Sequence, residues 1–140
     1  MYFQVSIDLW APMAYNVSME QELIPQVVVE TPAYLQSVKK FWSQEVQNEF
    51  KEYIGLNPLA GDVIPGLGGI RKIRWQGSGR GRRGGARVIY YVYNEDFPIY
   101  LFFAYAKNAQ TDLTEDEKEA LRKAAASLKS SFQRREKHHG

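Results

Sequence analysis

Basic and tyrosine side chains concentrate in one segment of this 140-residue chain. Between Gly69 and Lys107 there are eight lysines and arginines but two carboxylates, so this segment carries a net charge of +6 and the rest of the chain −4. Arginine forms paired hydrogen bonds to phosphate, lysine supplies a compact charge, and tyrosine can stack on a base or exchange a proton. A segment this basic in an otherwise mildly acidic chain predicts a polyanionic partner, with a solvated basic surface as the alternative.

The spacing of these residues predicts which of them share a surface. Because side chains alternate along a strand, Lys72 and Arg74 should project from one face of the run 70–76, and the apolar residues beside them from the other. The same alternation in the run 87–94 groups Arg87 with Tyr91, and antiparallel pairing brings Arg87 close to Lys72 or Arg74. In a regular meander, Tyr105 and Lys107 join this face. The residues predicted to gather on this face, and the candidates for any chemistry it carries, are therefore Lys72, Arg74, Arg87, Lys107, Tyr91 and Tyr105.

The glycine-rich stretch GSGRGRRGG, residues 77–85, joins two of these runs. It lacks the lysine pattern of a phosphate-binding P-loop and no helix follows it, so it is not a nucleotide-binding fingerprint. Its arginines instead extend the positive charge at the mouth of the basic face; a flexible hairpin tip with incidental charge is the alternative. The residues assigned to RNA binding are Arg71, Arg80, Arg82 and Arg83.

The other residue types argue against several alternative chemistries. The chain has no cysteine, and its two histidines, His138 and His139, stand at the end of the sequence, which disfavours thiolate metal sites and histidine-based catalysis. The carboxylates between Asp112 and Glu119 crowd a predicted helix start, where the helix dipole accounts for them without a metal. We therefore expect no metal and no cofactor. If the basic face cleaves RNA, the reaction would proceed by attack of a 2′-hydroxyl on the adjacent phosphate, with a lysine among arginines accepting the proton.

Helices and strands must position this face. Residues 26–30 (QVVVE) predict a short buried strand, because β-branched residues favour extended backbone. From Tyr34 to Ile54, apolar residues recur at three- and four-residue steps, which predicts an amphipathic helix with Thr31 as its N-cap and a proline in its first turn. Ser43 offers a cap for a second helix; a single long helix is the alternative. Residues 61–69 read as a loop.

Three strand-like runs, residues 70–76, 87–94 and 99–107, have connections that favour an antiparallel meander. Thr114 and Glu117 form a capping box for a final helix, whose apolar stripe is Leu121, Ala124, Leu128 and Phe132. The predicted fold is an α+β domain: a small antiparallel sheet with two N-terminal helices, or one long helix, and a C-terminal helix. We expect the helices to lie against one face of the sheet.

The length predicts one domain, placed at residues 27–135 and followed by a polar tail over residues 136–140. Residues 1–26 form an N-terminal extension that alternates like a strand until APMAYN interrupts it. Its alternative interpretations are an added edge strand, an ordered arm and a segment introduced for expression. No apolar run approaches the roughly 20 residues of a membrane span, and the first residues lack a secretory signal. We therefore expect a cytoplasmic protein without membrane contacts.

Four stretches together resemble the RelE/HigB-like toxins of type II toxin–antitoxin systems. They are VVVETPAYLQSVKKF, NPLAGDVIPGLGGIRKIRW, RRGGARVIYY and YAKNAQTDLTEDEKEAL, which follow the order of the family and span roughly Val27 to Leu128. The resemblance implies a RelE/ParE-like fold, in which two N-terminal helices pack a small antiparallel sheet and a C-terminal helix closes it. Residues 1–26 and the tail after Leu128 have no counterpart in this pattern.

The resemblance also implies roles for individual residues. The basic strand of the family corresponds to Lys72 and Arg74, and the arginine of its next strand corresponds to Arg87. The basic residue that ends its last strand corresponds to Lys107, where the local spacing differs from the family pattern. The tyrosine of the family site corresponds to either Tyr91 or Tyr105.

The activity implied is ribosome-dependent, metal-independent cleavage of messenger RNA in the ribosomal A site, which inhibits translation. The implied partners are a cognate antitoxin, mRNA and 16S rRNA, with operator DNA bound only through the antitoxin. The antitoxin should lay a helix over the basic face or add a strand to a sheet edge. A ParE-like gyrase inhibitor and a catalytically inactive module that binds antitoxin and regulates its operon are the alternatives. The clustered cations favour the endoribonuclease, because cleavage needs them and protein binding does not.

Overall fold

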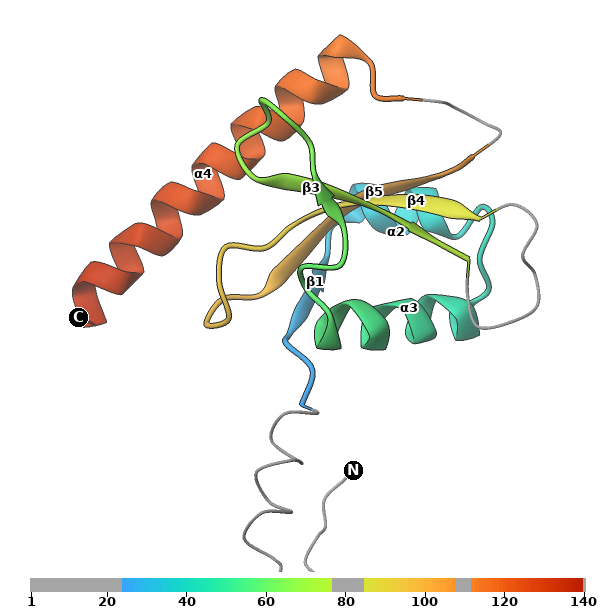
Figure 1. The fold of residues 1–140 in the computed structure, drawn as a ribbon, viewed down its shortest axis with the longest axis horizontal. Helices are drawn as coiled ribbons and strands as arrows, with labels where there is room; N and C mark the ends of the chain where they lie inside the picture. The colour runs from blue at the N-terminus through green and yellow to red at the C-terminus, as the bar shows by residue number, and fades with distance from the viewer. Residues whose placement is uncertain (1–23, 77–84, 108–111, 140) are drawn as a thin grey trace, which may run out of the picture.

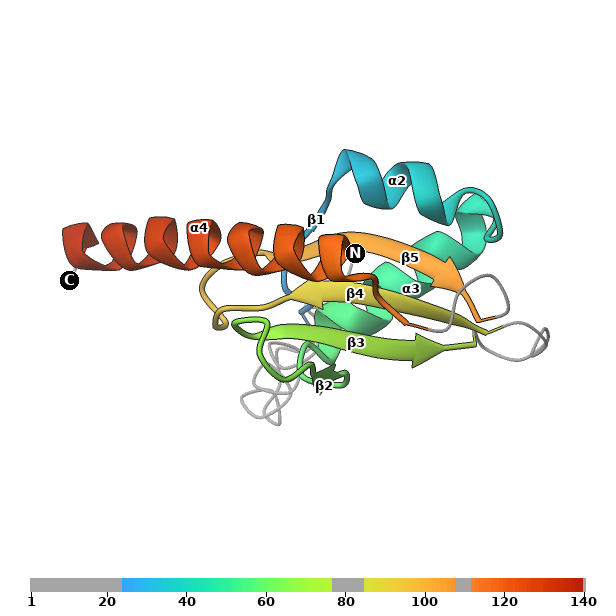
Figure 2. The ribbon, with the colours of Figure 1, turned by 90° about the horizontal axis from the view of Figure 1, so that it is seen from above.

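The computed structural model describes residues 24–76, 85–107 and 112–139. Over these residues the chain forms a five-stranded sheet in the order β1-β5-β4-β3-β2, with two helices on one face and one on the other (Figures 1 and 2). The elements are β1 (Val28–Glu30), α2 (Pro32–Val38), α3 (Gln44–Leu56), β2 (Asp62–Val63), β3 (Ile70–Trp75), β4 (Ala86–Tyr91), β5 (Ile99–Ala106) and α4 (Glu115–His139). The predicted α+β fold with a small, largely antiparallel sheet is confirmed.

Local sequence signals account for the two N-terminal helices. Thr31 is the N-cap of α2: its hydroxyl accepts a hydrogen bond from the N–H of Tyr34 at 3.2 Å, and Pro32 occupies the first turn. Ser43 caps α3 in the same way, through the N–H of Val46 at 3.3 Å. Two caps separated by a short connection produce a helical pair, so the alternative of one long helix is wrong.

The sheet is built around β4, which pairs antiparallel with β3 on one side and β5 on the other. At the edge beyond β5, β1 runs parallel to it, with Val28 beside Ile99. At the opposite edge, the two residues of β2 pair with Arg71 and Lys72 of β3. The loop predicted over residues 61–69 therefore contains a strand, which two residues are too few to reveal by alternation.

The pairing of β4 with β5 is interrupted by a bulge. Ile89 lies opposite Phe103, but the next residue, Tyr90, lies opposite Leu101, so Phe102 is an extra residue on β5. Phe102 and Phe103 consequently both pack on the α4 side of the sheet, although ordinary alternation would place them on opposite faces. The meander is therefore not regular, and the bulge decides which way the rest of β5 faces.

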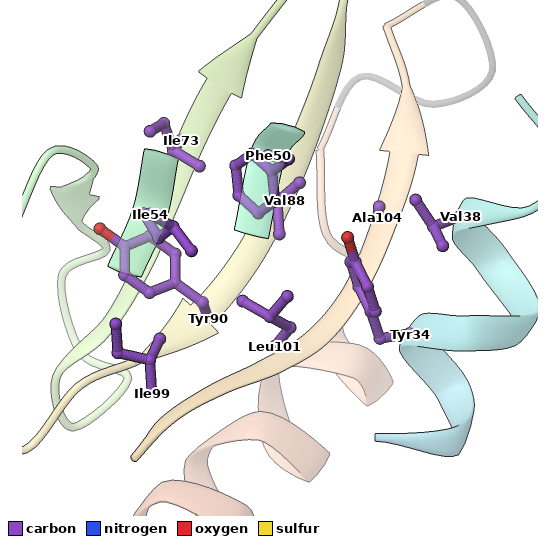
Figure 3. Packing of buried hydrophobic residues seen from close by; sticks show 10 residues of the cluster. All are labelled: Tyr34, Val38, Phe50, Ile54, Ile73, Val88, Tyr90, Ile99, Leu101 and Ala104. Carbon is purple, nitrogen blue, oxygen red and sulfur yellow. The ribbon is translucent and has the colours of Figure 1, made fainter. Parts of the chain in front are cut away.

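Each face of the sheet carries its own apolar cluster. On one face, Tyr34 and Val38 of α2 and Phe50 and Ile54 of α3 are fully buried against the strands (Figure 3). Figure 3 shows Tyr34 and Val38 beside Ala104 of β5. The strand residues of this cluster are Ile73, Val88, Tyr90, Ile99, Leu101 and Ala104.

The opposite face packs against α4, as Figure 2 shows. The expectation that all helices lie against one face is wrong, because the three long strands carry apolar residues on both faces and each face needs cover. The buried residues of this second cluster are Leu67, Ile70, Ile89, Tyr91, Tyr105, Leu113, Leu121, Ala125 and Phe132.

Helix α4 begins with the predicted capping box. The N–H of Glu117 donates to the hydroxyl of Thr114 at 3.1 Å, and the N–H of Thr114 donates to the Glu117 carboxylate at 2.9 Å. Its buried stripe contains Ala125 at 1% exposure, whereas the predicted Ala124 is only partly buried. Although α4 has 25 residues, neither it nor another helix in the described ranges is long and apolar enough to span a membrane.

The C-terminal end of α4 is held against the turn between β4 and β5. The carboxylate of Glu136 accepts hydrogen bonds from the hydroxyl of Tyr93 at 2.8 Å and from the side-chain amide of Asn94 at 3.0 Å. The ring of Phe132 stacks on that of Phe97, with centroids 4.4 Å apart. Regular helix therefore continues into the stretch predicted as a polar tail, as far as His139.

Candidate active site

Three of the predicted residues line up across the sheet. Arg74 of β3 lies directly opposite Arg87 of β4, and Arg87 lies directly opposite Tyr105 of β5. Directly opposite residues of antiparallel strands have Cβ atoms about 4.5–5.5 Å apart, so these side chains are neighbours on one face. We call Arg74, Arg87 and Tyr105 the basic row. It lies on the face that α4 partly covers, toward the strand ends that extend past the start of that helix (Figure 2).

The basic row passes from solvent into the protein. Arg74 is exposed and Arg87 is half-buried, while Tyr105 is only 6% exposed. The Nη1 atom of Arg87 and the hydroxyl of Tyr105 are both buried and have no hydrogen-bond partner in the part of the chain that the structure describes. Leaving such a group unpaired costs about 1–3 kcal/mol. Two adjacent unpaired donors favour an anionic oxygen that both can reach.

Tyr105 is a neutral hydroxyl near pH 7. Burial raises its pKa, the carboxylates of Asp112 and Glu117 raise it further, and the Arg87 guanidinium opposes them. A neutral phenol can donate a hydrogen bond or a proton but is a poor base. The sequence predicted only that Asp112 and Glu117 lie at the start of a helix. Their position near Tyr105 depends on the packing of α4 against β5.

The two predicted lysines flank the basic row. Lys72 lies two residues from Arg74 along β3, about 7 Å away on the same face, where it is half-buried opposite Ile89. Lys107 directly follows β5 and is exposed; its N–H donates to the carbonyl of Gly85 at 3.3 Å. The structure therefore brings one lysine onto the face beside the row and leaves the other at its open end.

Tyr91 lies apart from the basic row, although it shares the same face. It is four residues from Arg87 along β4, a distance of about 13 Å, and is paired with Ile70 and Tyr100. It is 3% exposed, and burial raises its pKa. Of the two tyrosines that the sequence left open, Tyr105 is therefore the one beside Arg87.

Arg71 lies on the other face of β3, opposite Tyr90. Its guanidinium donates to the carbonyl of Gly61 at 2.6 Å and to that of Leu59 at 3.4 Å. The hydroxyl of Tyr90 accepts from the N–H of Gly61 at 2.9 Å and donates to the carbonyl of Pro58 at 2.8 Å. Arg71 thus joins with Tyr90 in holding the segment before β2, and the structure does not bring it together with the basic row.

The other residues assigned to RNA binding, Arg80, Arg82 and Arg83, lie outside the described residues. Within the described ranges, no group of three or more histidine, cysteine, aspartate or glutamate residues is arranged to hold a metal ion.

The geometry defines a small α+β domain whose sheet presents arginine and tyrosine side chains on one face. The sequence profile of the family described as "RelE toxin of RelE / RelB toxin-antitoxin system" matches residues 61–137, more than half of the chain. The chain therefore belongs to the RelE toxin family. A similar solved structure is that of the E. coli toxin RelE, an arginine-to-alanine mutant in the free state. It is 18% identical, with 62% of this chain and 88% of that chain covered and a TM-score of 0.45.

Proposed function

We propose that this toxin is an endoribonuclease that cuts messenger RNA on the ribosome and thereby inhibits translation. The observation that carries the proposal is the basic row, in which Arg74, Arg87 and Tyr105 are consecutive neighbours across three strands. A phosphodiester placed over the row would meet two guanidinium groups and one neutral hydroxyl. These are the groups needed to bind an anion and to stabilise the additional negative charge of its transition state.

The proposed reaction is an internal transfer at the phosphate. The 2′-hydroxyl oxygen forms a bond to phosphorus while the bond from phosphorus to the 5′-oxygen breaks, which leaves a 2′,3′-cyclic phosphate and a 5′-hydroxyl. The 2′-hydroxyl proton passes to a base, for which Lys72 on the same face and Lys107 at the open end are the candidates. Tyr105, kept neutral by burial, donates its proton to the leaving 5′-oxygen. Arg74 and Arg87 stabilise the charge on the equatorial phosphate oxygens.

The proposed partners follow from family membership and from charge. A RelE-family toxin is paired with an antitoxin, here proposed to be a cognate protein that binds operator DNA on behalf of the complex. The substrate is proposed to be mRNA in the ribosomal A site, with 16S rRNA contacted by Arg80, Arg82 and Arg83 and the reaction taking place in the cytoplasm. No metal or cofactor takes part in the proposed reaction.

The test is primer extension on a reporter message in a purified translation system. Wild-type protein is compared with Arg74→Ala and Arg87→Ala, and with Arg134→Ala as a matched control. Arg134 is exposed on α4, where it donates to Ser130 at 3.0 Å, away from the basic row. We expect cleavage at discrete codons only when ribosomes are present, loss of cleavage in the two row variants, and wild-type cleavage in the control.

Three results would contradict the proposal. Cleavage retained in both row variants would mean that the basic row does not carry the reaction. An intact message, together with growth arrest by the wild-type protein in cells, would exclude the nuclease and direct attention to gyrase. Absence of both cleavage and growth arrest would indicate a module that only binds its antitoxin.

A further inference from the structure

The position of Tyr105 depends on the bulge in β5. Before the bulge, Tyr100 packs on the α4 side and Leu101 on the α2 side; after it, Ala104 is on the α2 side and Tyr105 on the α4 side. If β5 kept strict alternation from Tyr100 with no bulge, Ala104 would turn toward α4 and Tyr105 away from Arg87. The one-residue bulge at Phe102 is therefore what completes the basic row.

Thr31 binds the backbone on one side of this bulge. Its hydroxyl proton is shared between the carbonyls of Leu101 at 2.9 Å and Phe102 at 3.1 Å, and its N–H donates to the carbonyl of Leu101 at 3.2 Å. The same hydroxyl accepts the capping hydrogen bond from Tyr34. One side chain thus joins the start of α2 to the point where β5 departs from regular pairing.

Ser37 binds the backbone on the other side. Its hydroxyl accepts a hydrogen bond from the N–H of Ala104 at 2.9 Å and donates to the carbonyl of Tyr34 at 3.0 Å. Strand β1 ends at Glu30, opposite Leu101, and no other described strand continues along that edge of β5. Two hydroxyls of the α2 region therefore take the place of a strand at the stretch that contains the bulge.

We infer that Thr31 and Ser37 are positioning residues for the basic row. They act from the α2 side of the sheet by holding the bulge in β5, which keeps Tyr105 opposite Arg87. The catalytic consequence rests on the proposed function, whereas the effect on the orientation of Tyr105 can be measured without it. A misplacement of about 1 Å lowers the rate of a preorganised reaction by up to about 100-fold.

The test removes each hydroxyl while preserving the shape of the side chain. Thr31→Val and Ser37→Ala delete the hydrogen bonds to β5, and Thr31→Ser retains the hydroxyl and is the conservative rescue. Ser43→Ala is the matched control, because the Ser43 hydroxyl caps α3 through the N–H of Val46 and forms no hydrogen bond to a strand among the described residues. The two readouts are the cleavage rate as a function of the concentration of programmed ribosomes, which yields kcat and KM, and NMR contacts between the Tyr105 ring and the Arg87 side chain.

We expect Thr31→Val and Ser37→Ala to lower kcat by about 10- to 100-fold with KM changed less than about threefold, because the arginines that bind RNA stay in place. The NMR contact between Tyr105 and Arg87 should weaken in both. Thr31→Ser and Ser43→Ala should behave as the wild type in both measurements.

The inference is overturned if the Tyr105–Arg87 contact persists in both hydroxyl deletions, or if kcat falls no further than in Ser43→Ala. Failure of the wild-type protein itself to cleave RNA would count against the proposed function alone. In that case the NMR contact still decides whether Thr31 and Ser37 orient Tyr105.

Discussion

Arg87 and Tyr105 are directly opposite residues of β4 and β5, and each carries a buried polar atom without a hydrogen-bond partner in the described ranges of the chain. The two atoms, Nη1 of Arg87 and the hydroxyl of Tyr105, belong to a cation and to a phenol that burial keeps neutral. Two donors on directly opposite residues can be satisfied by the several oxygens of one phosphate.

The first prediction separates the two tyrosines of this face. Tyr105→Phe should lower ribosome-dependent cleavage by about 100-fold, because it removes the proposed proton donor while filling the same volume. Tyr91→Phe should change the rate less than about threefold, since Tyr91 lies about 13 Å along the strand from Arg87. The measurement is single-turnover cleavage of a reporter message. Cleavage by Tyr105→Phe no slower than by Tyr91→Phe would show that the Tyr105 hydroxyl does not have the proposed role.

The second prediction concerns phosphate binding by the row. Arg74→Gln should make the slope of log Kobs against log salt concentration for single-stranded RNA less steep by about 0.7, the value expected for one lost phosphate contact. Fluorescence anisotropy between 50 and 200 mM salt, about the range in which such contacts are measurable, provides the slope. Arg134→Gln, a charge-matched change on α4, should leave it unaltered. Identical slopes for all three proteins would place RNA binding elsewhere.

The third prediction concerns Tyr90, whose hydroxyl both accepts and donates a hydrogen bond. Tyr90→Phe removes the hydrogen bonds with the N–H of Gly61 and the carbonyl of Pro58 and leaves the buried N–H unpaired. We expect a loss of about 1–3 kcal/mol in the free energy of unfolding, measured by denaturant titration. The same substitution should leave cleavage by the remaining folded protein unchanged, since Tyr90 lies on the α2 and α3 face. A loss below about 0.5 kcal/mol would mean that these bonds contribute little.

The fourth prediction concerns Tyr34, whose buried hydroxyl, unlike that of Tyr90, has no hydrogen-bond partner among the described residues. Burial, with a further contribution from the Glu30 carboxylate, raises the pKa of Tyr34. A folded-state pKa above the unfolded value of about 10 stabilises the protein below that pH, and this stabilisation is lost as the pH rises toward the folded-state pKa. Tyr34→Phe should therefore be neutral or slightly stabilising at pH 7, and its unfolding free energy should fall less steeply above about pH 10.

Denaturant titrations at neutral pH and above pH 10 check this prediction, with Tyr90→Phe as the reference. Both tyrosines have raised pKa values through burial, so both substitutions should flatten the alkaline fall in stability. They should differ at neutral pH, where Tyr90→Phe alone is destabilising. A strongly destabilised Tyr34→Phe would instead reveal that the Tyr34 hydroxyl makes a stabilising interaction in solution.

The sequence by itself determined the features that depend on neighbouring residues. Thr31, Ser43 and the Thr114–Glu117 pair cap helices through bonds that span three residues, so their positions in the chain were sufficient to predict them. Alternation likewise separated Lys72 and Arg74 from the apolar residues of β3, since each strand repeats every two residues. The α+β class followed from the order of these local elements.

Only the tertiary structure decided which residues meet across the sheet. The bulge at Phe102 is defined by the pairing of β5 with β4 and by hydroxyls of the α2 region, far away in the sequence, so no pattern within β5 shows that Tyr105 faces Arg87. In the sequence, Arg71 is as plausible an RNA-binding residue as Arg74. The pairing of β3 places it on the other face of the sheet, where its guanidinium donates to backbone carbonyls. The second apolar face of the sheet packs against α4, and this packing places Asp112 and Glu117 near Tyr105. Contacts between distant segments are fixed by register and packing, and a single residue of shift reverses every side chain that follows it.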